Sequence, residues 1–184
     1  MTLFHGTDQI ITVIDFSRSR LRTDFGRGFY LSDKLGNARD WAVDKSELLG
    51  TPTVMRYEID SSIFRSVEVK QLRFEGPSID WLNFVRDNRR KDSPEASEIN
   101  PRHSFDIVSG PIANDKVAIA VDKYCRGVFT SEQALDEMRT IKGVYQLSMH
   151  THRALTFIQS VSYSQRFDGK WSNWATSSIH AFPI

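Results

Sequence analysis

Residues 24–32 read Asp24-Phe25-Gly26-Arg27-Gly28-Phe29-Tyr30-Leu31-Ser32. Two glycines separated by one residue permit positive φ angles and let a ligand come close to the main chain. The apolar and aromatic run that follows predicts a short strand carrying the phenol of Tyr30. A dinucleotide fingerprint places its glycines after a strand and before a helix, which is the reverse of the order found here. The stretch therefore predicts a turn that fixes Tyr30 at the rim of a cleft, and not a Rossmann loop.

Size and composition predict an ordinary globular protein. The 184 residues are long enough for one domain, 1–184, with a single core. A formal net charge of +1 argues against a general binder of polyanions. Cys125 is the only cysteine, which excludes an internal disulfide and a zinc site built from cysteines. With no secretion signal and no bilayer-length apolar run, we expect a cytoplasmic location and no membrane partner.

Hydrophobic periodicity predicts many short strands alternating with helices. The strands are expected at 2–4, 29–31, 53–59, 67–74, 105–108, 144–150 and 161–164, the first delivering His5-Gly6-Thr7 to a loop. Helices are expected at 34–45, after Ser78, from 114 or 115 to Tyr124, after Thr130 and at 151–157. A polar stretch at 89–102 predicts a mobile surface loop. The pattern predicts an α+β fold.

Four blocks occur in a fixed order along the chain: Phe4-His5-Gly6-Thr7, Asp24–Tyr30, Asp106–Asp115 and Gln146–Thr151, with Trp41 eleven residues after Tyr30. Together they resemble the ADP-ribosyltransferase superfamily of the His–Tyr–Glu type, which includes diphtheria toxin and the poly-ADP-ribose polymerases. The similarity is closer to a bacterial branch found beside a small antitoxin. It covers residues 2 to about 157 and leaves 158–184 as a C-terminal aromatic extension. The implied fold has split antiparallel and mixed β-sheets with flanking helices.

The resemblance implies an NAD-dependent mono-ADP-ribosyltransferase that acts as the toxin of a toxin–antitoxin pair. NAD would be the co-substrate, no metal would be needed, and the acceptor would be a protein or a nucleic acid. The implied catalytic residues are His5, Tyr30 and Gln146. The implied NAD-binding residues are His5, Gly6, Thr7, Gly28, Tyr30, Trp41 and Ser148.

Each implied role has a physical basis. The His5 imidazole would bond a hydroxyl of the adenosine-side ribose, and Gly6 backbone groups would bond the nicotinamide amide. Tyr30 and Trp41 would stack on the cationic nicotinamide ring, where a cation–π contact is worth ~0.5–2 kcal/mol. Cleavage of the nicotinamide–ribose bond passes through an oxocarbenium-like state, as glycoside cleavage does.

Gln146 departs from the family pattern, which has a glutamate at this position. A glutamine can hydrogen-bond a ribose hydroxyl, but its neutral amide cannot act as a base. This favours transfer of a single ADP-ribose, or NAD hydrolysis, over polymer synthesis. Two other classes stay open: a catalytically silent module that binds NAD or ADP-ribose, and an RNA 2′-phosphate-transferring enzyme using Arg18, Arg20 and Arg22.

Several residues also have ordinary structural interpretations. The spacing of Trp41 with Leu35, Ala38 and Ala42 predicts a core face of a helix equally well. We expect Arg27 to be solvated, His150 to be a bystander and the Asp106–Asp115 block to build a turn. Trp171 and Trp174 either pack the C-terminal extension onto the sheet or contact a partner.

Overall fold

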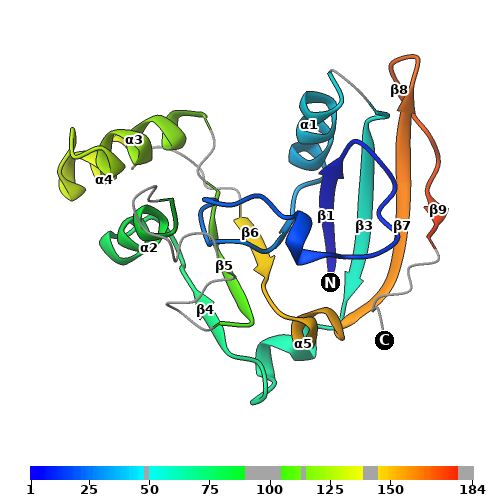
Figure 1. Cartoon of the computed structure of the whole chain (residues 1–184), viewed down its shortest axis with the longest axis horizontal. Coiled ribbons are helices and arrows are strands. Elements are labelled where there is room, and N and C mark those ends of the chain that lie inside the picture. Colours follow the sequence, from blue (N-terminus) through cyan, green and yellow to red (C-terminus); the bar gives the residue numbers. More distant parts are fainter. Residues whose placement is uncertain (48–49, 90–104, 113–114, 139–144, 178–184) are drawn as a thin grey trace. The chain divides into compact units, whose positions relative to one another are not determined.

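The computed structural model describes residues 1–47, 50–89, 105–112, 115–138 and 145–177, and it shows an α+β protein (Figure 1). The chain forms two compact units. Unit 1 contains Met1–Asp15, Tyr30–Val69 and His152–Ile184, and unit 2 contains Phe16–Phe29 and Lys70–Thr151. Most of the predicted mobile loop at 89–102 lies outside the described residues.

Unit 1 is built on three long antiparallel strands: β1 (Thr2–Thr7), β3 (Thr53–Ile59) and β7 (Ile158–Phe167). They lie side by side in Figure 1, with β3 in the middle. β2 (Phe29–Ser32) pairs with β1 through Ser32 and Phe4. The prediction that His5-Gly6-Thr7 forms a loop is wrong, because these residues continue β1 and pair with Thr53–Met55.

Helix α1 (Leu35–Lys45) forms where the sequence predicts it. Ala38 and Ala42 are its buried residues, and they pack with Val54 of β3. Trp41 is 44% exposed, so its interpretation as a core residue of this helix is wrong. Small side chains on the buried face let the helix backbone approach the sheet closely.

The C-terminal extension completes unit 1. β7 runs well beyond the predicted strand at 161–164 and is followed by β8 (Lys170–Trp171) and β9 (Ala175–Thr176), which both pair with it. Trp171 and Trp174 pack against the cluster of Ala38, Ala42 and Val54. Of the two alternatives for these tryptophans, the structure confirms packing within the chain.

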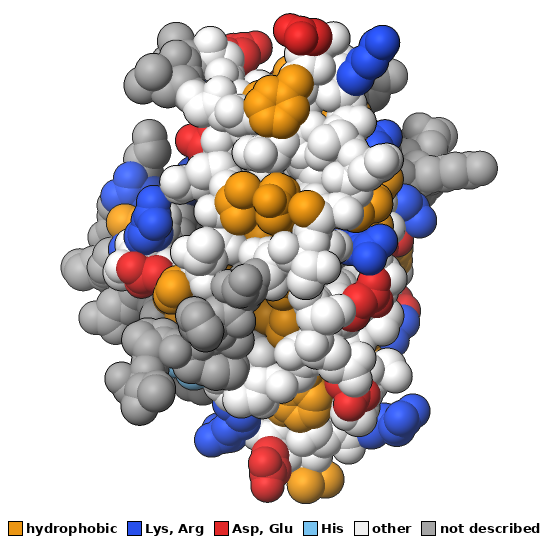
Figure 2. All heavy atoms as spheres, turned by 90° about the vertical axis from the view of Figure 1, so that its right-hand side faces the viewer, with side chains coloured by type: hydrophobic (Ala, Val, Ile, Leu, Met, Phe, Trp, Pro, Cys, Tyr) orange, Lys and Arg blue, Asp and Glu red, His pale blue; other side chains and the backbone are white. Residues whose placement is uncertain are grey.

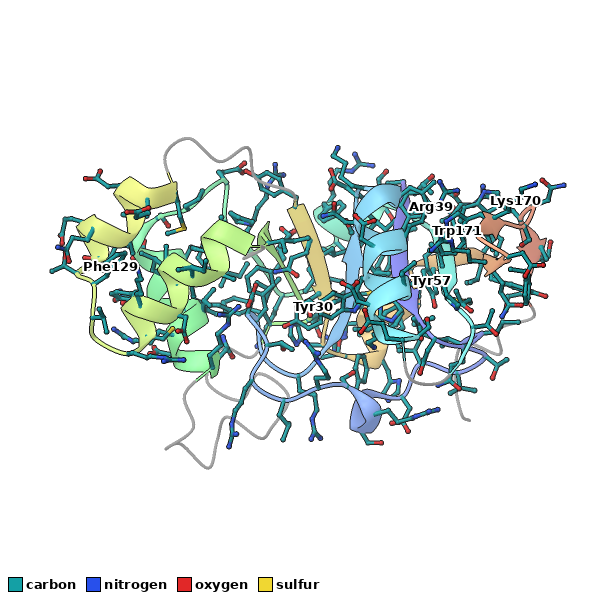
Figure 3. All side chains as sticks on the ribbon, turned by 90° about the horizontal axis from the view of Figure 1, so that it is seen from above. Tyr30, Arg39, Tyr57, Phe129, Lys170 and Trp171 are labelled. Atoms are coloured by element: carbon teal, nitrogen blue, oxygen red, sulfur yellow. The ribbon has the colours of Figure 1, made fainter. Side chains whose placement is uncertain are left out.

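Each tryptophan also lies beneath an arginine. The Arg39 guanidinium lies 5.2 Å from the ring centre of Trp171, and the two side chains are adjacent in Figure 3. The Arg56 guanidinium lies 5.0 Å from the ring centre of Trp174, whose ring centre is also 6.2 Å from that of Phe4. These contacts combine apolar burial with cation–π attraction. On the face that carries β7–β9, apolar side chains form separate patches down the middle, and basic and acidic side chains lie mostly toward the edges (Figure 2).

We expect Trp174→Ala to lower the free energy of unfolding by about 2 kcal/mol, because it removes both the contact with Phe4 and the stacking of Arg56. Phe167→Ala is the matched control, since Phe167 ends β7 but is 56% exposed. It should cost less than about 1 kcal/mol. Urea unfolding followed by circular dichroism measures both. Equal losses in the two variants would contradict packing of Trp174 into unit 1.

Over the residues that the structure describes, unit 2 combines a small mixed sheet with three helices. β4 (Gln71–Arg73) runs parallel to β5 (Ile107–Pro111), and β5 runs antiparallel to β6 (Tyr145–Met149). The helices are α2 (Ile79–Arg89), α3 (Asp115–Cys125) and α4 (Ser131–Met138). Short elements complete the two units: 3-10 turns at Phe16–Arg18 and Ser61–Arg65, and α5 (His152–Leu155).

The predicted helix signals of unit 2 are present as hydrogen bonds. The Ser78 hydroxyl accepts the Trp81 N–H at 3.1 Å at the start of α2. At α4, the Thr130 hydroxyl accepts the Gln133 N–H at 3.3 Å, and the Gln133 side chain accepts the Thr130 N–H at 2.9 Å. This reciprocal pair is the capping box that the sequence predicts.

Asp106 has a structural role, although its block forms strand β5 at Ile107–Pro111 where a turn was expected. Its carboxylate accepts the Lys70 N–H at 2.8 Å and the Thr151 hydroxyl at 2.6 Å. Its backbone carbonyl accepts the His150 N–H at 2.9 Å. Asp106 therefore connects the chain before β4 to the chain after β6. Within the ranges that the structure describes, no helix has the length and apolar character needed to cross a bilayer.

Candidate functional site

The turn before β2 is held against one face of β6. Residues two apart on a strand share a face, and Gln146, Ser148 and His150 follow this spacing. The Gln146 amide donates to the Asp24 carboxylate at 3.1 Å, and the His150 ring donates through Nδ1 to the Arg27 carbonyl at 2.9 Å. The first and last motif blocks of unit 2 are therefore in direct contact.

Gly28 is required at this contact. A Cβ on Gly28 would lie 2.8 Å from the imidazole ring of His150 and closer still to the Ser148 hydroxyl. Ser148 is 0% exposed and His150 is 1% exposed. Ser148 therefore supports the glycine turn from inside the protein. Gln146, on the same strand, is only partly buried.

Burial determines the protonation of His150. It lowers the pKa of this imidazole to about 4, against the opposing influences of the Arg27 carbonyl and the Asp106 charge. A neutral ring that donates from Nδ1 keeps Nε2 as an acceptor, and that buried atom has no hydrogen-bond partner among the described residues. Arg27 is half-buried, with a buried Nε, so the predicted solvation applies to only part of its side chain.

In unit 1, His5 is fixed by the backbone of β2. Its Nδ1 lies 2.7 Å from the Tyr30 carbonyl oxygen. A carbonyl only accepts, so Nδ1 must carry the proton. Burial, followed by the charge of Lys45, lowers the pKa of His5 to about 4 although the carbonyl bond opposes it. The ring is therefore neutral near pH 7, and Nε2 is a hydrogen-bond acceptor.

Gly6 and Thr7 follow His5 on β1 and are both buried. A Cβ on Gly6 would lie 2.9 Å from the backbone nitrogen of Ala42 and even nearer the carbonyl oxygen of Ala38. The Thr7 hydroxyl donates to the Asp8 carboxylate at 3.2 Å. Gly6 thus lets α1 rest directly on β1, next to His5.

The sequence-predicted site residues divide between the units. Unit 1 brings His5 and Tyr30 into contact and also carries Gly6, Thr7 and the exposed ring of Trp41. Unit 2 carries Gly28, Gln146 and Ser148. In the described part of the chain, no group of three or more His, Cys, Asp or Glu side chains could hold a metal ion.

Two residues of this region were missed at the sequence level. Asp24 is 8% exposed, and its carboxylate accepts from Arg89 Nε at 3.0 Å as well as from Gln146. Asp24 begins the glycine-containing stretch Asp24–Ser32, but no neighbouring residue in the sequence indicates that it contacts position 146. Arg89 belongs to a basic run that is typical of a solvated helix end.

Comparison with known proteins places the chain in a family. A family model described as "Protein of unknown function (DUF3990)" matches residues 1–160. The chain belongs to the DUF3990 family. Neither a curated protein nor a solved structure matches it. The DUF3990 match includes β1, the glycine turn and β6 but stops before Trp171 and Trp174, so the packing of the C-terminal extension lies outside it.

Proposed function

We propose that this DUF3990 protein is an NAD-dependent mono-ADP-ribosyltransferase with the split-sheet fold of that superfamily. The observation that carries the proposal is the hydrogen bond from His5 Nδ1 to the Tyr30 carbonyl. It fixes a neutral imidazole whose Nε2 accepts hydrogen bonds. An acceptor of this kind can bind a ribose hydroxyl. The resemblance also names His5 and Tyr30 together as site residues, and this hydrogen bond joins them directly.

Exposed aromatic surface on α1 gives the proposal further support. Trp41 is 44% exposed, although an apolar side chain on a helix that packs against a sheet is ordinarily buried. Stacking on a cationic nicotinamide ring uses the face of such an indole and is worth ~0.5–2 kcal/mol. The proposal therefore assigns nicotinamide stacking to Trp41 and Tyr30, and a backbone contact with the nicotinamide amide to Gly6.

Gln146 supports transfer of a single ADP-ribose. Nicotinamide leaves as a neutral group, so bond cleavage requires no general acid. An amide oxygen that accepts the ribose hydroxyl would position NAD without acting as a base. NAD hydrolysis uses the same groups, with water as the acceptor. The macromolecular acceptor would be a protein or a nucleic acid, and the resemblance assigns the protein the role of a cytoplasmic toxin with a small antitoxin partner.

The test is transfer of label from NAD. We expect the protein to release nicotinamide and to label a component of a cell extract, and His5→Ala or Tyr30→Ala to reduce both at least 100-fold, since each loss removes binding in the transition state. Tyr30→Phe keeps the ring and should retain most activity. His152→Ala is the control for histidine loss, because His152 is exposed. Nicotinamide release without labelling would identify a glycohydrolase.

A silent binding module is the second candidate, and the neutral amide of Gln146 favours it. Such a protein would bind NAD or ADP-ribose in calorimetry and release no nicotinamide. The loss of binding in Tyr30→Ala, together with absent turnover in the wild-type protein, would establish this function in place of the enzyme.

A further inference from the structure

The orientation of the Gln146 side chain follows from its neighbours. Its amide nitrogen lies 3.1 Å from the Asp24 carboxylate and 3.4 Å from the Pro111 carbonyl oxygen. Both neighbours only accept hydrogen bonds. The NH₂ group must therefore face them, and the amide oxygen is the atom that Gln146 can offer to a ligand hydroxyl.

Arg89 forms an ion pair with Asp24. Its guanidinium donates to the Asp24 carboxylate from Nε at 3.0 Å and from a terminal nitrogen at 2.5 Å. An arginine stays protonated in proteins, and Asp24 has only 11% of its side chain exposed. The ion pair of Arg89 and Asp24 thus lies next to the neutral amide of Gln146, in surroundings where a further charge has little solvent to stabilise it.

We propose that Asp24 is the positioning residue of Gln146, and that positions 24 and 146 together hold one carboxylate. This inference rests on the proposed function, because it explains how an amide replaces the family glutamate. A glutamate at 146 would place a second carboxyl group about 3 Å from that of Asp24. At this distance the repulsion between two negative charges opposes ionisation of both groups. In this chain the carboxylate stands at 24, and its hydrogen bond with the amide nitrogen leaves the Gln146 oxygen as the atom that can accept from a ligand.

A charge exchange tests the inference without reference to activity. We expect Gln146→Glu to lower the urea midpoint at pH 7.5 by roughly 1 M, because it places two carboxyl groups next to each other. Adding Asp24→Asn should restore most of the midpoint, because one carboxylate is again present. Gln159→Glu is the control, since Gln159 is an exposed residue of β7. No rescue by Asp24→Asn, or equal effects at 146 and 159, would overturn the inference.

Kinetics then separate this inference from the proposed function. We expect Gln146→Glu and Asp24→Asn each to reduce kcat for nicotinamide release at least tenfold with little change in KM, and the double variant to recover most of kcat. Full kcat in both single variants would overturn positioning by Asp24 while the proposed function stands. If the wild-type protein releases no nicotinamide, the proposed function is wrong, and so is the role of Asp24 in that reaction. The urea series still decides whether positions 24 and 146 together hold one carboxylate.

Discussion

Gly6→Ala should destabilise the protein by about 3 kcal/mol, or roughly 6–12 °C in melting temperature for a chain of this length. The new Cβ would lie 2.9 Å from the Ala42 nitrogen and closer to the Ala38 carbonyl oxygen. Both atoms belong to the backbone of α1, so no side-chain rotation relieves the collision. The helix has to move away from β1, which opens the packing of Ala38 and Ala42 on Val54.

The same helix supplies the control. Gly36 also lies in α1, and a Cβ there would meet no atom within 4 Å. Gly36→Ala should therefore be neutral or stabilising by up to about 1 kcal/mol, because alanine favours the helix over the unfolded chain. Differential scanning fluorimetry on both variants measures the contrast. If Gly6→Ala melts within about 2 °C of the wild-type protein, β1 and α1 are not in direct backbone contact.

This contact shows what the residues of the first motif do for the fold. The sequence marks His5-Gly6 only as a ligand-binding pair. The structure adds that Gly6 sets the distance between β1 and α1, the helix that carries Trp41. Any substitution at Gly6 would disturb packing before it disturbed chemistry, so loss of activity in such a variant would not identify a binding residue.

Local signals in the sequence predicted most elements of the two units. The helix periodicity at 34–45, the capping box at Thr130 and the N-cap at Ser78 are each encoded within a few residues, and all are confirmed. The order of the motif blocks likewise placed Gly28 and Gln146 in the candidate site. Whether those residues act on NAD stays a prediction.

Long-range partners explain what the sequence did not predict. His5-Gly6-Thr7 resembles a loop because of its glycine, but pairing with β3 extends the strand through it. Trp171 ends the two-residue strand β8 and Trp174 lies in the irregular chain before β9, so no helical or strand period links the two side chains that pack on Ala38, Ala42 and Val54. Asp24 and Arg89 are 65 residues apart. No local pattern reveals such a pair.

Acid should destabilise the fold through His150. Burial lowers the pKa of its imidazole from 6.5 to about 4. The unfolded chain therefore takes up a proton at His150 near pH 6.5, while the folded protein does so only near pH 4. The stability held in the neutral ring is fully present above pH 6.5 and is lost progressively as the pH falls to 4. Since a pKa difference of one is worth about 1.4 kcal/mol, the loss approaches roughly 3 kcal/mol at pH 4.

His150→Gln separates this effect from the general acid lability of carboxylates. The variant loses stability at pH 7.5, because the donor to the Arg27 carbonyl is changed, but its unfolding free energy should fall less steeply between pH 6.5 and 4. His152→Gln, an exposed position two residues along, should retain the wild-type slope. Urea titrations at four pH values in this range measure all three proteins. Parallel slopes for wild type and His150→Gln would mean that His150 is solvated or already charged, and the close packing of Ser148 and His150 on Gly28 would then have to be abandoned.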